Sequence, residues 1–500
     1  MHNRLLINAL STVGQVITTG FTYFLLYGIW IRELGAKQLG IWSIVWTTTY
    51  FAGMANSGVP VGIVKFIAEA HVKKDMMQAR SIVTMSIIIT TLLNFLICTV
   101  LYLNASWLFQ FLIQSPSEVA TAKEIFPLAL LAFWLLNLAN VFMYTLDGFQ
   151  VNYLRSILNI AASITLFISA YLLIYKGLWG IVIAHIIYTL FILLGSVFMV
   201  ARYMKTPFIF NLNFEKQLFI NFFKYSIKLQ IASASTLLYD PITKFLLAKY
   251  NSLDAVGFYE MANRLVTQIR SVIVTANQVM VPKIVETSIN STNNFQHLYI
   301  MMFRLLTIIS TPLLFSFFFF APFISLIWIG KIETFFVFSV YTLVVGWYLN
   351  TLSVPAYISN MGVGQLRHNI IQHLAMALLN VFLGVLGGFF FEGYGVVSAW
   401  TASLSISSGI LIYLFHRKNN LNFDMLRFEG DYNYIVSLLV LLIGASIFNF
   451  IFSKSSTNWV LIFIIYSIIY FCWLFWIVKS SPFINELRLR FNNFRFLKKN

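Results

Sequence analysis

Long apolar stretches alternate with short polar connections along most of the chain. Each stretch is close to the roughly 20 apolar residues that a helix needs to cross a bilayer. Fourteen of them cover residues 5–31, 39–63, 81–103, 125–146, 156–175, 178–201, 225–250, 255–282, 304–330, 335–358, 369–391, 395–415, 433–452 and 459–478. The connections are too short to hold a soluble domain. The pattern predicts an all-α, polytopic membrane protein with about 14 transmembrane helices.

Landmarks of the first half recur in the second half at an offset of 215 to 217 residues. Leu39-Gly40 returns as Val256-Gly257, Trp42 as Tyr259, Gly148 as Gly364, Gly180 as Gly395 and Arg202 as Arg417. The predicted organisation is an N-lobe of six helices (1–204), a cytoplasmic linker (205–224), a C-lobe of six helices (225–417), two extra helices (433–478) and a basic tail (479–500). Since six is an even number, both lobes have the same orientation. We expect a pseudo-twofold axis along the membrane normal that relates them.

Charge distribution gives the expected orientation in the membrane. The chain is 59% hydrophobic, only 10% charged and carries a net charge of +16. If the N-terminus is cytoplasmic, 23 of the 33 basic residues fall on cytoplasmic segments, as the positive-inside rule requires. This pattern predicts a membrane protein with both termini in the cytoplasm, and it explains the net charge without nucleic acid. The basic tail fits either contact with anionic membrane lipids or a plain positive-inside anchor. Cys98 and Cys472 fall inside predicted spans and do not indicate a redox compartment.

Polar residues form stripes inside several predicted helices. Arg264 lies ten residues into the helix over 255–282, roughly 15 Å deep and near the bilayer midplane. Gln268 and Ser271 share its face, while Arg270 lies about 120° away. The candidate cavity residues are Arg264, Gln268, Ser271, Arg270, Gln15 and Asn56, and Asp240 with Lys244 form a possible structural pair or ion-coupling site. Because helices in equivalent positions carry these stripes, we expect them to converge on one central cleft.

Each of these residues also has a plainer structural interpretation. Ser and Thr stripes can serve close helix packing, and Arg264 can belong to an ion pair, although a charge at the midplane usually faces a water-filled cavity. Asp240 and Lys244 have the favourable i, i+4 order, so they can neutralise each other, with ion coupling by Asp240 as the alternative. His185 is expected to be a hydrogen-bonded interior histidine. Lys244, Arg264 and Arg270 outnumber Asp240 as deep charges, and this balance favours an anionic substrate.

Signatures of catalysis do not stand out in the sequence. We find no metal-ligand spacing, nucleophile elbow or glycine-rich phosphate loop. We therefore expect no catalytic residues, metal or cofactor, and a transporter rather than an enzyme.

The chain resembles a polysaccharide or O-antigen flippase of the multidrug, oligosaccharidyl-lipid and polysaccharide (MOP) exporter superfamily. The resemblance rests on Gly40 and Trp42, on Asn56-Ser57-Gly58 leading to Pro60 and Lys65, on Gly257-Phe258-Tyr259 with Ala262 and Arg264, on Pro282, and on Gly364-Gln365-Leu366-Arg367. It implies that an undecaprenyl-pyrophosphate-linked oligosaccharide moves from the inner to the outer leaflet by alternating access. Membrane lipids and other polysaccharide assembly proteins are the partners that it implies. Many such flippases have an acidic residue where Asn56 stands.

Three alternatives stay open at this point. The two extra helices also resemble peptidoglycan-precursor lipid flippases, and a cation-coupled multidrug exporter belongs to the same superfamily. The third alternative is a membrane polysaccharide polymerase or ligase, which needs a large outward loop with catalytic residues. The longest outward connection, about residues 104–124, offers only Glu118, Lys123 and Glu124 as charged residues.

Overall fold

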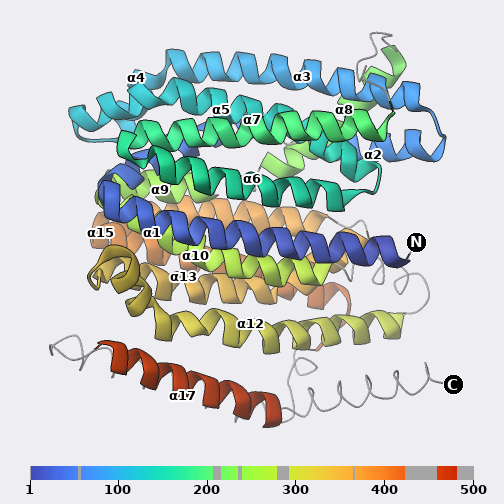
Figure 1. Ribbon diagram of the computed structural model, residues 1–500. Coiled ribbons are helices and arrows are strands. Elements are labelled where there is room, and N and C mark those ends of the chain that lie inside the picture. The colour runs from blue at the N-terminus through green and yellow to red at the C-terminus, as the bar shows by residue number, and fades with distance from the viewer. Residues whose placement is uncertain are drawn as a thin grey trace.

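The computed structural model of the 500-residue chain describes residues 2–54, 58–205, 216–234, 239–278, 292–363, 366–422 and 459–480. These residues form long helices that run roughly parallel to one another, with no strand among them (Figure 1). The helices are α1 (His2–Met54), α2 (Gly58–Val72), α3 (Met76–Leu103), α4 (Ala105–Leu112), α5 (Pro116–Gly148), α6 (Asn152–Leu173), the 3-10 helix η1 (Ile174–Lys176), α7 (Leu178–Tyr203), α8 (Lys216–Ala234), α9 (Tyr239–Tyr250), α10 (Leu253–Gln278), α12 (Thr292–Ile329), α13 (Thr334–Leu352), α14 (Val354–Gly362), α15 (Arg367–Lys418) and α17 (Trp459–Ser480). The prediction of an all-α polytopic membrane protein is confirmed.

Helix boundaries follow local sequence signals at several points. The side chain of Asp75 caps α3 by accepting a hydrogen bond from the Gln78 backbone N–H at 2.9 Å. Pro116 occupies the first position of α5, where its missing N–H costs no helical hydrogen bond. The backbone leaves helical geometry at Gly35 (φ 80°) in α1 and at Phe391–Glu392 in α15, so each of these elements consists of two helices that meet at a kink. The predicted span 433–452 and most of the tail lie outside the described residues.

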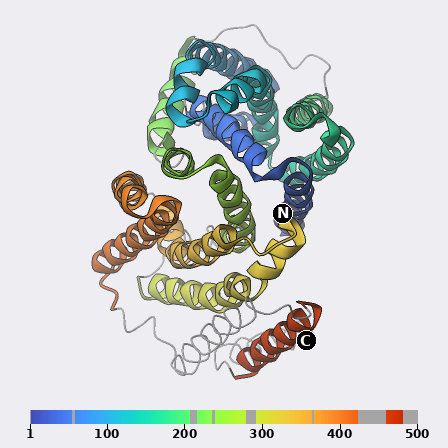
Figure 2. The same ribbon diagram turned by 90° about the vertical axis from the view of Figure 1, so that its left-hand side faces the viewer.

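The most apolar helices surround less apolar ones at the centre. Seven segments of the described chain are long and apolar enough to cross a membrane: α3, α5, α6 with η1, α7, α12 from Phe295, α13 with α14 to Met361, and α15. The more polar α1 and α10 are not in this set, and α1 packs more extensively against α10 than against any other described helix. Viewed end-on, α1 and α10 lie between the helices of residues 58–203 and the helices that follow α10 (Figure 2). Polar side chains are thereby sheltered from lipid.

Two glycines allow the closest approach of α1 and α10. A Cβ atom on Gly40 would overlap the backbone carbonyl of Leu253, and a Cβ atom on Gly257 would overlap the carbonyl of Ala36. Gly40 and Gly257 are 217 positions apart, as are Ala36 and Leu253. The two contacts are therefore the same contact seen from either half of the chain, which is the relation a local twofold axis produces. The lobe and linker boundaries themselves remain predictions, and α8 begins at Lys216, inside the segment assigned to the linker.

Candidate functional site

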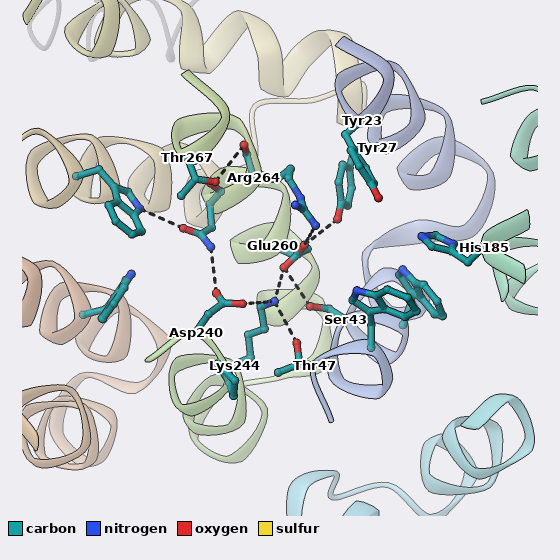
Figure 3. Close-up of a pocket in the computed structure, with 16 residues that line it drawn as sticks. Tyr23, Tyr27, Ser43, Thr47, His185, Asp240, Lys244, Glu260, Arg264 and Thr267 are labelled. Atoms are coloured by element: carbon teal, nitrogen blue, oxygen red, sulfur yellow. Dashed lines mark hydrogen bonds and ion pairs between the residues drawn. The ribbon is translucent and has the colours of Figure 1, made fainter. Parts of the chain in front are cut away.

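A cavity of about 360 Å³ lies where α1, α9 and α10 meet (Figure 3). Side chains from α7, α13 and α15 complete its walls. The lining residues are Tyr23, Tyr27, Trp42, Ser43, Trp46, Thr47, His185, Asp240, Pro241, Lys244, Glu260, Asn263, Arg264, Thr267, Trp347 and Trp400. Its volume is at the lower end of the range typical of small-molecule sites. The lining combines four charged side chains with a wall of aromatic rings.

Lys244 of α9 is enclosed by three partners. Its Nζ lies 2.6 Å from Asp240 Oδ2 and 2.6 Å from Glu260 Oε2, and it donates a hydrogen bond to Thr47 Oγ1 at 3.1 Å (Figure 3). Only 7% of the side chain is exposed. A buried ammonium needs such compensation because desolvation strongly penalises an unpaired charge. Lys244 is therefore committed to internal contacts, and it joins α9 to both α1 and α10.

Glu260 of α10 is the acceptor at the centre of the network. Besides Lys244, it accepts hydrogen bonds from Tyr27 Oη at 2.8 Å and from Ser43 Oγ at 3.3 Å, both on α1. Its fourth contact is Arg264, whose Nη2 lies 3.6 Å from Oε1. The carboxylate is 10% exposed, so its charge is compensated mainly by buried donors.

Arg264 and Asp240 are the charged groups that the cavity exposes. The side chain of Arg264 is 36% exposed and its guanidinium lies over the Tyr23 ring, 4.7 Å from the centroid. The side chain of Asp240 is 42% exposed and accepts a hydrogen bond from Asn263 Nδ2 at 3.0 Å. When all four groups are ionised, the two buried charges cancel and so do the two exposed ones. The cavity thus offers a ligand one cation and one anion on a neutral background.

An aromatic cluster forms the α1 wall. Trp42 and Trp46 are stacked with ring centroids 5.2 Å apart, and His185 of α7 packs against both, at 4.8 Å and 5.1 Å. His185 Nδ1 lies 2.9 Å from the backbone carbonyl of Ile181, so this nitrogen carries the proton and donates. The expectation of a hydrogen-bonded interior histidine is confirmed. All three line the cavity, but Trp42 and His185 are buried whereas Trp46 is only partly buried, so Trp46 is the member of this cluster with the most exposed surface.

The structure brings together three of the residues predicted to form the site and places four elsewhere. Arg264, Asp240 and Lys244 line the cavity, and the predicted Asp240–Lys244 ion pair is present. The others are not among the lining residues: Gln15 lies on α1, and Gln268, Arg270 and Ser271 lie on α10. Gln268 donates to the Val16 carbonyl at 2.5 Å, Ser271 Oγ donates to the Gln268 carbonyl, Arg270 donates to Asn350 Oδ1 and stacks over Trp347, and Gln15 Oε1 is buried without a hydrogen-bond partner in the described part of the chain. Asn56 lies outside the described residues.

Glu260 corrects the predicted balance of charge. Arg264 does have a deep carboxylate neighbour in its own helix, four residues earlier. The acid-first i, i+4 spacing that identified Asp240 and Lys244 applies equally to Glu260 and Arg264, so the signal was present in the sequence. Two basic residues, Lys244 and Arg264, therefore face two acidic residues, Asp240 and Glu260, in the cavity. An anionic ligand must be argued from exposure instead.

Comparison with known families places this cavity in context. The model of a polysaccharide biosynthesis protein family matches residues 6–288, which is more than half of the chain. The chain belongs to this polysaccharide biosynthesis protein family. The matched region includes α1, α7, α9 and α10, and hence every cavity residue except Trp347 and Trp400. A search of curated protein sequences found no match.

Solved structures show that this polysaccharide biosynthesis family member has the fold of MOP superfamily transporters. The lipid II flippase MurJ in an inward closed conformation aligns with a TM-score of 0.72 and 13% identity, over 94% of this chain and 98% of MurJ. A multidrug resistance transporter of the MATE family in an inward-facing conformation aligns with a TM-score of 0.70 and 15% identity, over 82% and 98% of the two chains. A MOP superfamily transporter from Pyrococcus furiosus aligns with a TM-score of 0.61 and 15% identity, over 83% and 95%. At these identities, the likeness concerns the fold.

Proposed function

We propose that this protein is a flippase that moves an undecaprenyl-pyrophosphate-linked oligosaccharide, such as an O-antigen or capsule repeat unit, from the cytoplasmic to the outer leaflet by alternating access. The observation that carries the proposal is Arg264, a partly exposed arginine in a cavity of a polysaccharide biosynthesis family protein. Arginine suits a diphosphate because its planar guanidinium can bind two phosphate oxygens at once and stays charged when desolvated.

Exposure distinguishes Arg264 from the other deep cation of the cavity. Lys244 makes two 2.6 Å ion contacts and is almost fully enclosed, so a ligand phosphate would have to displace a carboxylate from it. The ion contact between Arg264 and Glu260 is longer, at 3.6 Å, and Lys244, Tyr27 and Ser43 already stabilise that carboxylate. Arg264 can therefore turn toward a ligand phosphate without leaving Glu260 unpaired, and a charge pair that is partly shielded from water is stronger than one in bulk solvent.

Two further readings within the same superfamily compete with this one. Asp240, 42% exposed beside aromatic rings, favours an organic cation and hence a cation-coupled multidrug exporter. The fold of the lipid II flippase MurJ favours a peptidoglycan-precursor lipid, which would also bring a diphosphate to Arg264. The match to a polysaccharide biosynthesis family supports the oligosaccharide lipid as substrate rather than an organic cation or a peptidoglycan precursor.

The proposal includes an orientation in the bacterial cytoplasmic membrane with both termini inside and with two lobes, 1–204 and 225–417. Basic residues support this orientation, since most of them fall on the segments assigned to the cytoplasm. Cysteine labelling tests it in a variant whose Cys98 and Cys472 are replaced. Single cysteines at residues 71, 210, 423 and 490 should react from the cytoplasm, and those at 115 and 333 from outside. Labelling of residue 490 from outside would contradict the arrangement.

Replacement of Arg264 tests the transport proposal. Arg264→Ala should abolish polysaccharide export while the protein still reaches the membrane, because a lost charge-assisted contact to a buried phosphate costs about 2–3 kcal/mol. Arg264→Lys should restore export only partly, since an ammonium cannot form the bidentate contact. Arg202→Ala is the matched control, because Arg202 is exposed at the end of α7. Normal export by Arg264→Ala, at a normal protein level, would refute the role of Arg264.

A further inference from the structure

The aromatic wall of the cavity offers a ligand a kind of surface that the charged network does not offer. Trp46 has its indole supported by Trp42, at 5.2 Å, and by His185, at 5.1 Å. Trp42 is 4% exposed and His185 is 3% exposed and held by the Ile181 carbonyl. Both supports are fixed in place, so Trp46 offers a rigid aromatic surface whose ordering requires little entropy on binding.

We propose that Trp46 is a sugar-binding platform that stacks against the first sugar of the substrate, the one attached to the diphosphate. This inference rests on the proposed function and adds a division of labour to it: Arg264 binds the diphosphate and Trp46 binds the adjoining pyranose ring. A pyranose has an apolar face of C–H groups, which are attracted to the electron-rich face of an indole. Its hydroxyl groups point outward around the ring and require polar partners.

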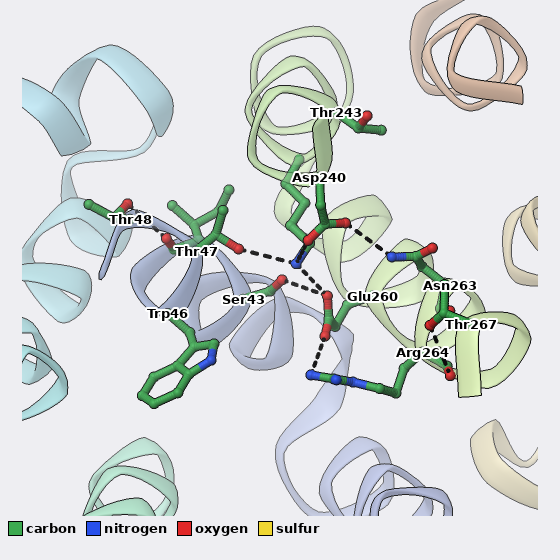
Figure 4. A network of polar contacts seen from close by, with 12 residues as sticks. Ser43, Trp46, Thr47, Thr48, Asp240, Thr243, Glu260, Asn263, Arg264 and Thr267 are labelled. Atoms are coloured by element: carbon green, nitrogen blue, oxygen red, sulfur yellow. Dashed lines mark hydrogen bonds and ion pairs between the residues drawn. The ribbon is translucent and has the colours of Figure 1, made fainter. Parts of the chain in front are cut away.

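Geometry supports one headgroup spanning both subsites. Trp46 and Arg264 line the same cavity and lie on opposite sides of the Ser43–Glu260 contact in Figure 4. Asp240 lines the cavity as well, and its carboxylate, 42% exposed, supplies acceptor oxygens suited to sugar hydroxyls. The cavity volume of about 360 Å³ leaves room for a diphosphate and its neighbouring sugar but not for a long repeat unit. The specificity of Trp46 would therefore concern the first sugar.

A packing role for Trp46 is the competing explanation, and other tryptophans of the chain show what it looks like. Trp30 is completely buried, and its ring contacts Tyr27 at 5.5 Å as part of the core. Trp46 differs because it keeps exposed surface and this surface lines the cavity. An aromatic platform can also attract an organic cation, so the experiment must separate a sugar from a cation.

Binding measurements on the purified full-length protein separate these roles. The probes are undecaprenyl pyrophosphate, the same lipid carrying one N-acetylhexosamine, and tetraphenylphosphonium as an organic cation. We expect the wild-type protein to bind the sugar-bearing lipid more tightly than the bare lipid. Trp46→Ala should lower affinity for the sugar-bearing lipid roughly threefold to tenfold and leave affinity for the bare lipid unchanged. Trp46→Phe should recover part of the loss, because it keeps an aromatic face.

Control variants and alternative outcomes make the result decisive. Trp107→Ala removes an exposed indole of α4 (67% exposed) and should leave both lipid affinities unchanged. Equal loss of both lipids in Trp46→Ala, or loss of cation binding alone, would overturn the platform while leaving the flippase proposal standing. Equal affinity of the wild-type protein for the sugar-bearing and the bare lipid would also overturn the platform and leave the flippase proposal standing. Failure of the wild-type protein to bind either lipid would instead refute the proposed function. Thermal unfolding of Trp46→Phe shows whether the fold is retained.

Discussion

The α1 side and the α9–α10 side of the cavity occupy equivalent positions in the chain but carry different chemistry. At the offset of 217 residues, uncharged Tyr23, Tyr27, Ser43 and Thr47 correspond to Asp240, Lys244, Glu260 and Arg264. All eight line the cavity. The charged groups are thus confined to one half, and the other half supplies hydroxyl groups that solvate them, as Tyr27 and Ser43 do for Glu260 and Thr47 does for Lys244.

The difference in charge between the two sides has a physical reason, because a residue near a twofold axis contacts its own equivalent from the other half. Ser43 contacts Glu260, its own equivalent, at 3.3 Å. A carboxylate at both positions would place two like charges against each other in a buried site, and one would have to be protonated. Three residues before Ser43 and Glu260, Gly40 and Gly257 each lie against the other helix. A Cβ atom at either position would overlap a backbone carbonyl, so both halves require glycine there. Near the axis, steric limits keep the two halves alike, whereas electrostatic limits drive them apart.

Removal of Glu260 should destabilise the protein more than any of the other proposed substitutions, because the uncharged half of the cavity donates to this carboxylate. Glu260→Ala leaves Lys244 with Asp240 and Thr47 and deprives Tyr27 and Ser43 of their acceptor, at a cost of about 3–5 kcal/mol. The thermal unfolding temperature of the purified protein should fall sharply. Glu69→Ala, which removes the acid of an exposed pair with Lys65, should change stability by less than about 1 kcal/mol. An equal effect of both variants would contradict the central role of Glu260.

Exchange of the two axis residues sharpens the same test. In the double variant Ser43→Glu with Glu260→Ser, the carboxylate moves to α1 but stays next to its former position. Lys244 already donates to Thr47, one turn from residue 43, so it can meet the relocated carboxylate. We expect the exchange to recover a substantial part of the stability that Glu260→Ala loses. Stability no better than that of Glu260→Ala would show that the site is not locally twofold.

The two glycines provide a test of intermediate size. Gly40→Ala and Gly257→Ala each force a methyl group onto a backbone carbonyl, and overpacking of this kind costs about 1–3 kcal/mol. Because the contacts are equivalent, the two variants should lower the unfolding temperature by similar amounts. Gly14→Ala is the control, since no atom lies within 4 Å of the added methyl group, and it should leave stability unchanged or slightly raise it. A large difference between Gly40→Ala and Gly257→Ala would break the symmetry argument.

The smallest effect is expected for the coupling between Asp240 and Lys244. Asp240→Asn and Lys244→Gln each unbalance the network, whereas the double variant leaves Glu260 paired with Arg264, Tyr27 and Ser43. We expect the double variant to regain most of the export lost by either single change, with a coupling energy on the order of 1 kcal/mol because Asp240 is 42% exposed. A double variant as inactive as Asp240→Asn would indicate an ion-coupling role for Asp240 instead.

Sequence patterns predicted the helices well and the site only in part. Apolar length defines membrane spans whatever their neighbours are, and the i, i+4 rule found the Asp240–Lys244 pair. Helical periodicity also placed Gln268 on the face of Arg264, but it cannot say which helix covers that face at a given height. Gln268 meets the backbone of α1 at Val16, beyond the cavity. The aromatic wall could not be predicted, because α1 and α7 bring Trp46 and His185 together only through tertiary packing.

The balanced charges of the cavity have an electrical consequence for a transport cycle. Asp240, Lys244, Glu260 and Arg264 sum to zero when all are ionised, so a conformational change of the empty protein carries no net charge from this cluster through the membrane field. A bound diphosphate would change that, since each elementary charge moved across the full field is worth about 2.3 kcal/mol per 100 mV. With the cell interior negative, the membrane potential would then drive the loaded anion outward and leave the return of the empty carrier unopposed.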